Sequence, residues 1–166
     1  MNWQEAYLAQ ARSDWTTYRI LQQHADVGAH DELHYLQMAS EKLAKAALLA
    51  SGVELAEVRT THRVVVKCLR VLRHCGPLQR AYGLDNDAWR QMLGSLAPAA
   101  DSIELLCPAL AGSGPNTEYP WSTVDGGEAI APCRHAWRPD PRQNRRTIRL
   151  LALLDLLLRD FERLFG

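Results

Sequence analysis

The residues of this chain best suited to bind a charged ligand are a run of basic side chains with no acidic residue among them. Between Val58 and Leu84 there are six arginines and lysines and no aspartate or glutamate, although the 166-residue chain has a formal net charge of zero. At about 100° of rotation per helical residue, part of this run falls on one narrow stripe, opposite an apolar side. This pattern predicts a helix with one face in the core and the other turned toward an anion. The residues of the stripe are Arg63, Lys67, Arg70 and His74.

A second group of cations marks the start of the last expected helix. The positive end of a helix macrodipole disfavours cations by about 0.3 to 1 kcal/mol each, so an anion is expected nearby. That anion is either phosphate, which suits arginine and free backbone N–H groups, or carboxylates of the chain itself. Trp121 and Trp137 precede this group, and they either stack on a base or pin a loop onto the core. The residues of the group are Arg142, Arg145, Arg146 and Arg149.

The net charge of zero is the sum of blocks of opposite sign. Residues 1–58 carry four basic and eight acidic groups, and residues 59–84 carry six and none; residues 85–133 carry one and seven, and residues 134–166 carry eight and four. The basic blocks therefore either meet phosphate or pair with the acidic blocks of the same chain. Such pairs at a surface contribute only about 0.2 to 1 kcal/mol each.

The elements that position these cations are typical of one all-α domain over residues 1–166. A chain of this length buries one core well and two poorly. The periodicity and the caps predict a four- or five-helix up-and-down bundle. The expected helices are Asn2 to His24, His30 to Ser51, Thr60 or Thr61 to His74, Asp85 or Asn86 to Leu96 and Pro98 to Cys107 as one kinked helix or two, and Asp140 to Leu164.

Glycines and prolines break the helical pattern over residues 112–139, so we expect a long irregular insertion before the last helix. Within it, Tyr119 to Val124 and Glu128 to Ala131 flank the turn sequence Asp125-Gly126-Gly127. This arrangement predicts a small β-hairpin.

The last helix has more apolar surface than one packing seam requires, which indicates burial on two sides. We therefore expect a homodimer formed through residues 150–164. The apolar stripe consists of Leu150, Leu153, Leu154, Leu157, Phe161 and Leu164, with Leu151 and Leu158 beside it.

Several function classes have no sequence support. The longest apolar stretch, Leu150 to Leu158, has nine residues with Asp155 among them, against about 20 for a membrane span. The first residues do not resemble an export signal, and the four cysteines form no CxxC pair, so we expect a cytoplasmic protein with reduced thiols. Phosphate-loop and serine-nucleophile motifs are absent, and no cofactor is expected.

A metal site has only a weak pattern behind it. His30 and His34 lie one helical turn apart, and His62 could approach them from the next helix. A two-metal bundle requires the carboxylate and histidine pattern to repeat on another helix, and it does not. We therefore expect no metal.

The second expected helix carries a family resemblance. Residues 37–46 read Gln-Met-Ala-Ser-Glu-Lys-Leu-Ala-Lys-Ala, and Thr61-His62 and an apolar helix follow after Gly52. With Tyr119-Pro120 before the last helix, this resembles the HEPN domain, a family of helical bundles named for nucleotide binding in higher eukaryotes and prokaryotes. The likeness covers most of the chain in outline and is specific over residues 37–62. The family-like positions are Glu41, Lys42, Lys45 and His62.

The resemblance implies a compact bundle, commonly dimeric, that binds nucleotides or RNA and often works beside a nucleotidyltransferase. Many members are metal-independent ribonucleases, including toxins of toxin–antitoxin pairs. They carry an arginine and a histidine, separated by four to six intervening residues, near the start of a late helix. The last helix here has no histidine, and only Arg19 and His24 show that spacing. We therefore expect a non-catalytic nucleotide- or RNA-binding protein. The alternatives are a ribonuclease of toxin type and a pure protein-interaction module.

Overall fold

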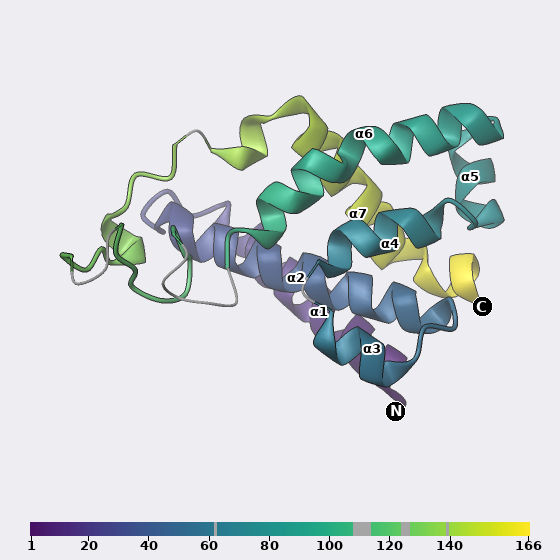
Figure 1. Ribbon diagram of the computed structural model, residues 1–166, viewed down its shortest axis with the longest axis horizontal. Coiled ribbons are helices and arrows are strands. Elements are labelled where there is room, and N and C mark those ends of the chain that lie inside the picture. Colours follow the sequence, from purple (N-terminus) through teal and green to yellow (C-terminus); the bar gives the residue numbers. More distant parts are fainter. Residues whose placement is uncertain (62, 108–113, 124–126, 139) are drawn as a thin grey trace.

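Every regular secondary-structure element in the described part of the chain is a helix. The computed structural model describes residues 1–61, 63–107, 114–123, 127–138 and 140–166 (Figure 1). Within these residues there are seven α-helices and two short 3₁₀ turns, Pro132–Arg134 and Pro141–Gln143. The α-helices are α1 (Trp3–Leu21), α2 (Ala29–Ala50), α3 (Leu55–Thr60), α4 (Val64–Leu72), α5 (Gly76–Tyr82), α6 (Asn86–Glu104) and α7 (Arg145–Phe165).

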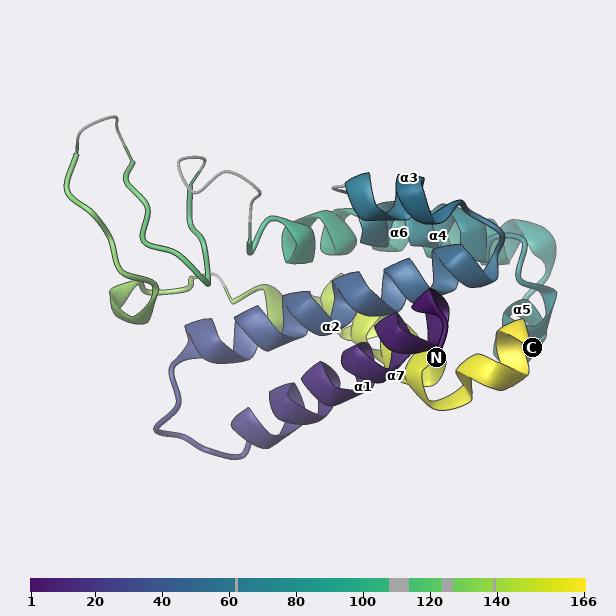
Figure 2. The ribbon, with the colours of Figure 1, turned by 90° about the horizontal axis from the view of Figure 1, so that it is seen from below.

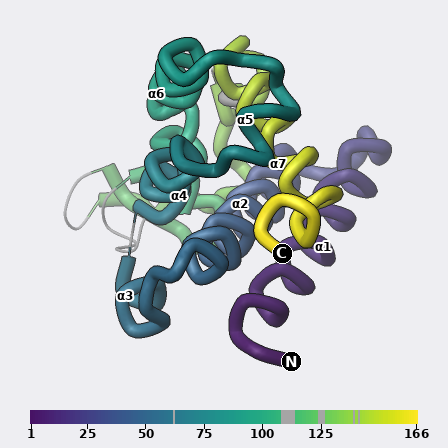
Figure 3. Tube along the Cα trace, turned by 90° about the vertical axis from the view of Figure 1, so that its right-hand side faces the viewer, coloured from purple at the N-terminus to yellow at the C-terminus, as the bar shows by residue number. Residues whose placement is uncertain are grey.

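Helix α2 is the centre of the packing. It pairs with α1 along its length as an antiparallel hairpin (Figure 2) and also contacts α3, α4, α6 and α7. The view along the helices places α2 between these elements (Figure 3). Its buried side chains include Ala39, Ala44 and Ala47, and small residues allow neighbouring helices to approach closely. The predicted all-α class is confirmed, but the helices are more numerous than the four or five expected because α3 and α5 are separate short elements.

The predicted helix from Thr60 or Thr61 is wrong at its start. The two threonines close α3 instead of capping α4, since Thr60 donates to the carbonyl of Ala56 (3.1 Å) and Thr61 to that of Glu57 (2.8 Å). Thr61 then has an extended backbone, and Arg63 takes the N-cap position of α4. A hydroxyl serves a helix end in either direction, so sequence alone did not decide between them.

The segment expected to be one kinked helix or two forms one helix, α6. Asp85 accepts from the backbone N–H of Ala88 at 2.8 Å, as its predicted cap role requires. The helix then runs without interruption through Pro98.

Helix α7 begins later than predicted. Asn144 caps it by accepting from the N–H of Arg146 at 2.8 Å, whereas Asp140 accepts from the N–H of Arg142 within a separate 3₁₀ turn. Arg142 therefore lies outside the helix. Near its far end α7 is kinked at Asp160, and Arg12 of α1 donates to the Leu158 carbonyl at 2.8 and 3.0 Å.

The wide apolar face of α7 is covered within the chain. Leu150, Leu153 and Leu157 are fully buried, and Leu154 and Leu158 are nearly so. Helix α7 packs against α1, α2, α5 and α6, which accounts for burial on more than one side. The observation that predicted a homodimer through 150–164 therefore has an intramolecular explanation, and the dimer stays a prediction without that support.

Among the described residues of the irregular insertion, the pairing expected of a hairpin is found at one point. Trp121 and Ile130 form an antiparallel bridge, with N–H to carbonyl distances of 3.2 and 2.8 Å. The turn residues Asp125 and Gly126 lie outside the described residues. No helix in the described part of the chain is both long enough and apolar enough to cross a membrane.

Candidate functional site

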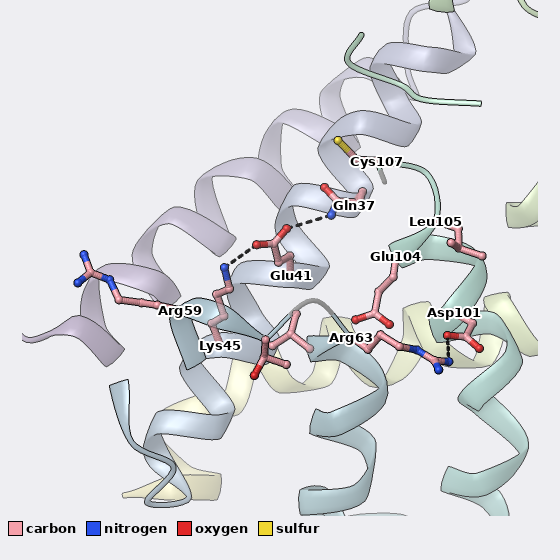
Figure 4. A pocket seen from close by; sticks show the side chains of 11 residues that line it. Gln37, Glu41, Lys45, Arg59, Arg63, Asp101, Glu104, Leu105 and Cys107 are labelled. Carbon is pink, nitrogen blue, oxygen red and sulfur yellow. Dashed lines mark hydrogen bonds and ion pairs between the residues drawn. The ribbon is translucent and has the colours of Figure 1, made fainter. Parts of the chain in front are cut away.

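A cavity of about 700 Å³ opens between α2, the start of α4 and the end of α6 (Figure 4). We call it the central cavity. Its volume lies within the range of small-molecule sites. It brings together residues from positions 37 to 107, including three from the HEPN-like sequence at residues 37–46. Its lining side chains are Gln37, Glu41, Lys45, Arg59, Thr61, Arg63, Val64, Asp101, Glu104, Leu105 and Cys107.

Glu41 lies on the α2 wall and is held from two directions. Lys45, one turn along, donates to one carboxylate oxygen at 2.6 Å, and the Gln37 amide donates to the other at 3.0 Å. Burial alone would raise the pKa of Glu41, but the hydrogen bond and charge of Lys45 outweigh it and lower that pKa. Glu41 is therefore an ionised and already occupied acceptor.

Gln37 contributes an acceptor that is not occupied. Its side chain is 6% exposed, and with the amide N–H engaged by Glu41 the Oε1 atom is buried without a hydrogen-bond partner in the described structure. A buried polar atom left in this state costs about 1 to 3 kcal/mol. A donor on a molecule inside the cavity would relieve that cost.

Glu104 is the second unsatisfied acceptor, at the end of α6. Its Oε1 atom accepts from the backbone N–H of Val65 at 2.6 Å, while Oε2 is buried and unpartnered among the described residues. Burial raises the pKa of Glu104 to about 7, and the Asp101 charge adds to the rise, whereas the Val65 N–H and Arg63 oppose it. This carboxyl can thus change charge near neutral pH.

The cations at the rim of the central cavity face away from its interior (Figure 4). Arg63 pairs with Asp101, and the Arg59 guanidinium lies over the ring of Trp3, 4.6 Å from its centroid. The remaining lining cation, Lys45, is paired with Glu41, so the cavity offers unpartnered acceptors while its cations are engaged within the described structure.

A shallower hollow of about 580 Å³ runs along the outer side of α4, and we call it the α4 groove. Thr61 and Arg63 line both hollows, so the groove meets the central cavity at these residues. The predicted basic stripe lines the groove, over a floor that includes Val66 and Val71. The basic residues of the groove are Arg63, Lys67, Arg70 and His74.

The groove cations differ in their internal partners. Lys67 pairs with Glu57 of α3, and Arg63 pairs with Asp101 as above, both on exposed or half-exposed surface. Arg70 is exposed and has no acidic partner within the part of the chain that the structure describes. Exposed ion pairs contribute about 0 to 1 kcal/mol, so they compete weakly with phosphate.

Arg142 is placed very differently from the groove cations. It pairs with Glu32 of α2 and, at 2.8 Å, with Asp140, and its side chain is only 18% exposed. Burial alone would lower the pKa of Arg142, but the hydrogen bonds and charges of the two carboxylates raise it. The predicted phosphate role of Arg142 thus meets a guanidinium that is already neutralised inside the chain.

The other arginines of this second group lie on the first turns of α7. Arg145, Arg146 and Arg149 are exposed, and no acidic partner is found for them in the described ranges. Arg146 lines a separate hollow of about 560 Å³ between α6 and α7, together with Trp137. Arg146 and the cations of the α4 groove line different hollows, so the seven predicted ligands are not brought into one site.

The two tryptophans of the insertion pack with the loop itself. Trp121 is 3% exposed and lies against the rings of His135 and Trp137, at centroid distances of 5.0 and 5.9 Å. Trp137 donates to the Pro132 carbonyl at 3.2 Å. Loop packing accounts for Trp121, because a buried ring offers no free face to a base.

The family-like positions divide between structure and site. Glu41 and Lys45 line the central cavity, whereas Lys42 pairs at 2.9 Å with Asp14 of α1, and both of these side chains are largely buried. His62 lies outside the described residues, but its neighbours Thr61 and Arg63 both line the cavity.

The remaining sequence candidates are dispersed. Arg19 lies in the last turn of α1 and His24 follows that helix, and both are exposed. His30 pairs with Asp31 at 3.3 Å, and no group of three histidine, cysteine or acidic side chains suited to a metal occurs among the described residues. The Cys107 thiol is no ready nucleophile, since burial and Glu118 raise its pKa to about 12.

Comparison with family models, curated proteins and solved structures found no match for the chain. The HEPN resemblance therefore stays a prediction.

The hydrogen-bond acceptors of the central cavity were not predicted from the sequence. Gln37 was visible only as part of the family-like segment, and Asp101 and Glu104 only as members of an acidic block. Their spacing of three residues places them on one face of α6, which is the signal that was available.

Proposed function

We propose that this chain is a non-catalytic, HEPN-like protein that binds nucleotides or RNA, with phosphate held in the α4 groove. The observation that supports the proposal is that a basic groove and a ligand-sized cavity lie next to each other. A solvent-facing groove is lined by cations of an acid-free segment, and at Thr61 and Arg63 it adjoins a cavity large enough for a ligand. A nucleotide has an anionic end for the groove and a polar base for the cavity.

The energetics support phosphate binding at α4 more than at Arg142. Arg63 and Lys67 hold exposed carboxylates, whose pairing is weak, and Arg70 is exposed. Arg142 would have to leave a largely buried pair, which costs several kcal/mol. The phosphate contacts of the proposal are therefore Arg63, Lys67 and Arg70, with His74 beside them and the exposed Arg145, Arg146 and Arg149 as a separate, secondary surface.

The test is binding of labelled single-stranded RNA by fluorescence anisotropy at several salt concentrations. Three phosphate contacts predict that log affinity falls with log salt at a slope of about −2. The variant Arg63→Gln/Lys67→Gln/Arg70→Gln should lose most of the affinity and of the slope. Arg159→Gln/Arg163→Gln is the matched control, since these exposed arginines also pair with an acid of the chain, Asp160. Undetectable binding by the wild type, or equal loss in both variants, contradicts the proposal.

The ribonuclease alternative is tested by incubating RNA with the protein in EDTA. The proposal expects no cleavage. Cleavage that disappears in His24→Ala or His62→Ala, but not in a His135→Ala control, would contradict the proposal and show that the protein is a metal-independent ribonuclease. The nucleotidyltransferase partner and the homodimer implied by the resemblance stay predictions.

A further inference from the structure

The interior of the central cavity is built to receive hydrogen-bond donors. Glu41 is occupied by Lys45 and Gln37, whereas Gln37 Oε1 and Glu104 Oε2 are buried and lack a partner among the described residues. Gln37 is more than nine-tenths buried, so water reaches its acceptor poorly. Donors for these two acceptor atoms would therefore have to come from a molecule bound in the cavity.

The cations that line the cavity are each engaged within the described structure, so they offer little to an anionic group. Lys45 pairs with Glu41, and Arg63 pairs with Asp101. The Arg59 guanidinium lies over the Trp3 ring. Leu105, 67% exposed, adds an apolar surface at the edge. A neutral, flat group with several donors suits these walls.

Among the common nucleobases, guanine best matches this requirement. Its pairing edge carries two adjacent donors, the ring N1–H and the 2-amino group. Glu104 can accept from both, because Oε2 is unpartnered and Oε1 has a second lone pair beside the one that the Val65 N–H uses. Adenine and cytosine place one amino donor next to a ring-nitrogen acceptor, and uracil places one N–H between two carbonyls. Bases outside a duplex are read on this edge by protein hydrogen bonds.

We propose that the central cavity is a guanine-selective base pocket, with Glu104 accepting from the pairing edge of the base and Gln37 supplying a further acceptor. The proposal rests on the proposed function, because it places the phosphate of the same nucleotide in the α4 groove beyond Arg63. The shared lip of the two hollows, at Thr61 and Arg63, provides that connection.

The experiment compares guanosine, inosine, adenosine, cytidine and uridine 5′-monophosphates by isothermal titration calorimetry at pH 8, where Glu104 is mainly ionised. All five carry the same phosphate. Guanosine monophosphate should bind at least about tenfold more tightly than the adenosine, cytidine and uridine compounds. Inosine monophosphate, which lacks only the 2-amino group, should fall between them. Equal affinities for all five overturn the inference.

Variants identify the acceptors. Glu104→Gln should remove the preference for guanosine over inosine, while Asp87→Asn, the same change of a carboxyl to an amide at the other end of α6, should keep it. If Glu104→Gln fails to fold, Gln37→Met serves instead and should weaken guanosine binding. A preference that survives both changes overturns the inference.

The outcomes separate this inference from the proposed function. RNA binding that depends on the α4 groove but shows no base preference overturns only the guanine pocket. Absence of binding to RNA and to every nucleotide overturns both. Displacement of guanosine monophosphate by spermidine at lower concentration than by guanosine would assign the cavity to organic cations and overturn the pocket.

Discussion

The cations of α4 and those at the start of α7 look alike in the sequence but differ in the folded protein. Arg70 on α4 has an exposed side chain on a groove that adjoins the central cavity. Arg142, before α7, is held by Glu32 and Asp140 in a largely buried network. Glu32 lies 110 residues earlier in the chain. A cluster of arginines in the sequence therefore predicts that anions lie nearby. The packing of distant elements decides whether those anions are carboxylates of the same chain.

The largest expected effect concerns the packing of α7. Leu154→Ala should lower the free energy of unfolding by about 2 to 5 kcal/mol, because Leu154 is 3% exposed within the single chain and its loss leaves a cavity. Urea denaturation measures the change, and gel filtration of the folded variant should give the wild-type elution volume. A dimeric wild type that becomes a monomer without loss of stability would restore the predicted dimer through 150–164.

Arg142 should behave as a structural residue. Arg142→Ala should cost about 2 to 4 kcal/mol of stability, since it leaves two partly buried carboxylates without a cation, while RNA affinity stays within about twofold. Arg149→Ala is the matched control and should change stability by less than about 0.5 kcal/mol. Lower RNA affinity at unchanged stability would place Arg142 with the ligand contacts instead.

The carboxyl beside the start of α4 should make stability depend on pH. Glu104 has a pKa raised from 4.5 to about 7 in the folded state, so folding favours its proton. The associated stability is complete below pH 4.5 and is lost as pH rises through 7. Glu104→Gln does not titrate. After a reduction for partial exposure, its stability relative to wild type should rise by about 1 to 2 kcal/mol between pH 4 and pH 8.

Thermal unfolding at both pH values measures this difference. Asp87→Asn, the same carboxyl-to-amide change at an exposed position of α6, is the control for effects of the substitution that do not depend on burial. A constant difference from wild type for Glu104→Gln would mean that Glu104 is solvated.

The smallest effect compares single cations of the two groups. Arg70→Gln should weaken RNA binding by about threefold to tenfold at low salt and make the salt slope shallower by about 0.7, as the loss of one phosphate contact requires. Arg149→Gln should change the affinity less than Arg70→Gln. Equal effects would indicate that RNA covers both groups, and the distinction between them in binding would disappear.

The helices were largely predictable, and their connections were not. The Asp85 cap and the apolar stripe of α7 depend on residues within a few positions, and both lie where the pattern put them. Thr61 was placed at the wrong helix end, because its hydroxyl donates to Glu57 behind it instead of accepting from an N–H ahead. The family-like Lys45 reached the cavity, but Lys42 was taken by Asp14 of another helix.

By itself, the sequence determined that the chain is helical, that α4 turns an acid-free basic side to solvent, and that α7 needs apolar contacts on more than one side. These features follow from periodicity and capping, which are properties of neighbouring residues. Tertiary structure alone decided that Arg142 is neutralised and that Leu154 is covered within one chain. It also decided that Gln37 and Glu104 line one cavity, each with one oxygen atom that has no partner among the described residues. Charge pairing and desolvation depend on which distant elements pack together, and no local pattern carries that information.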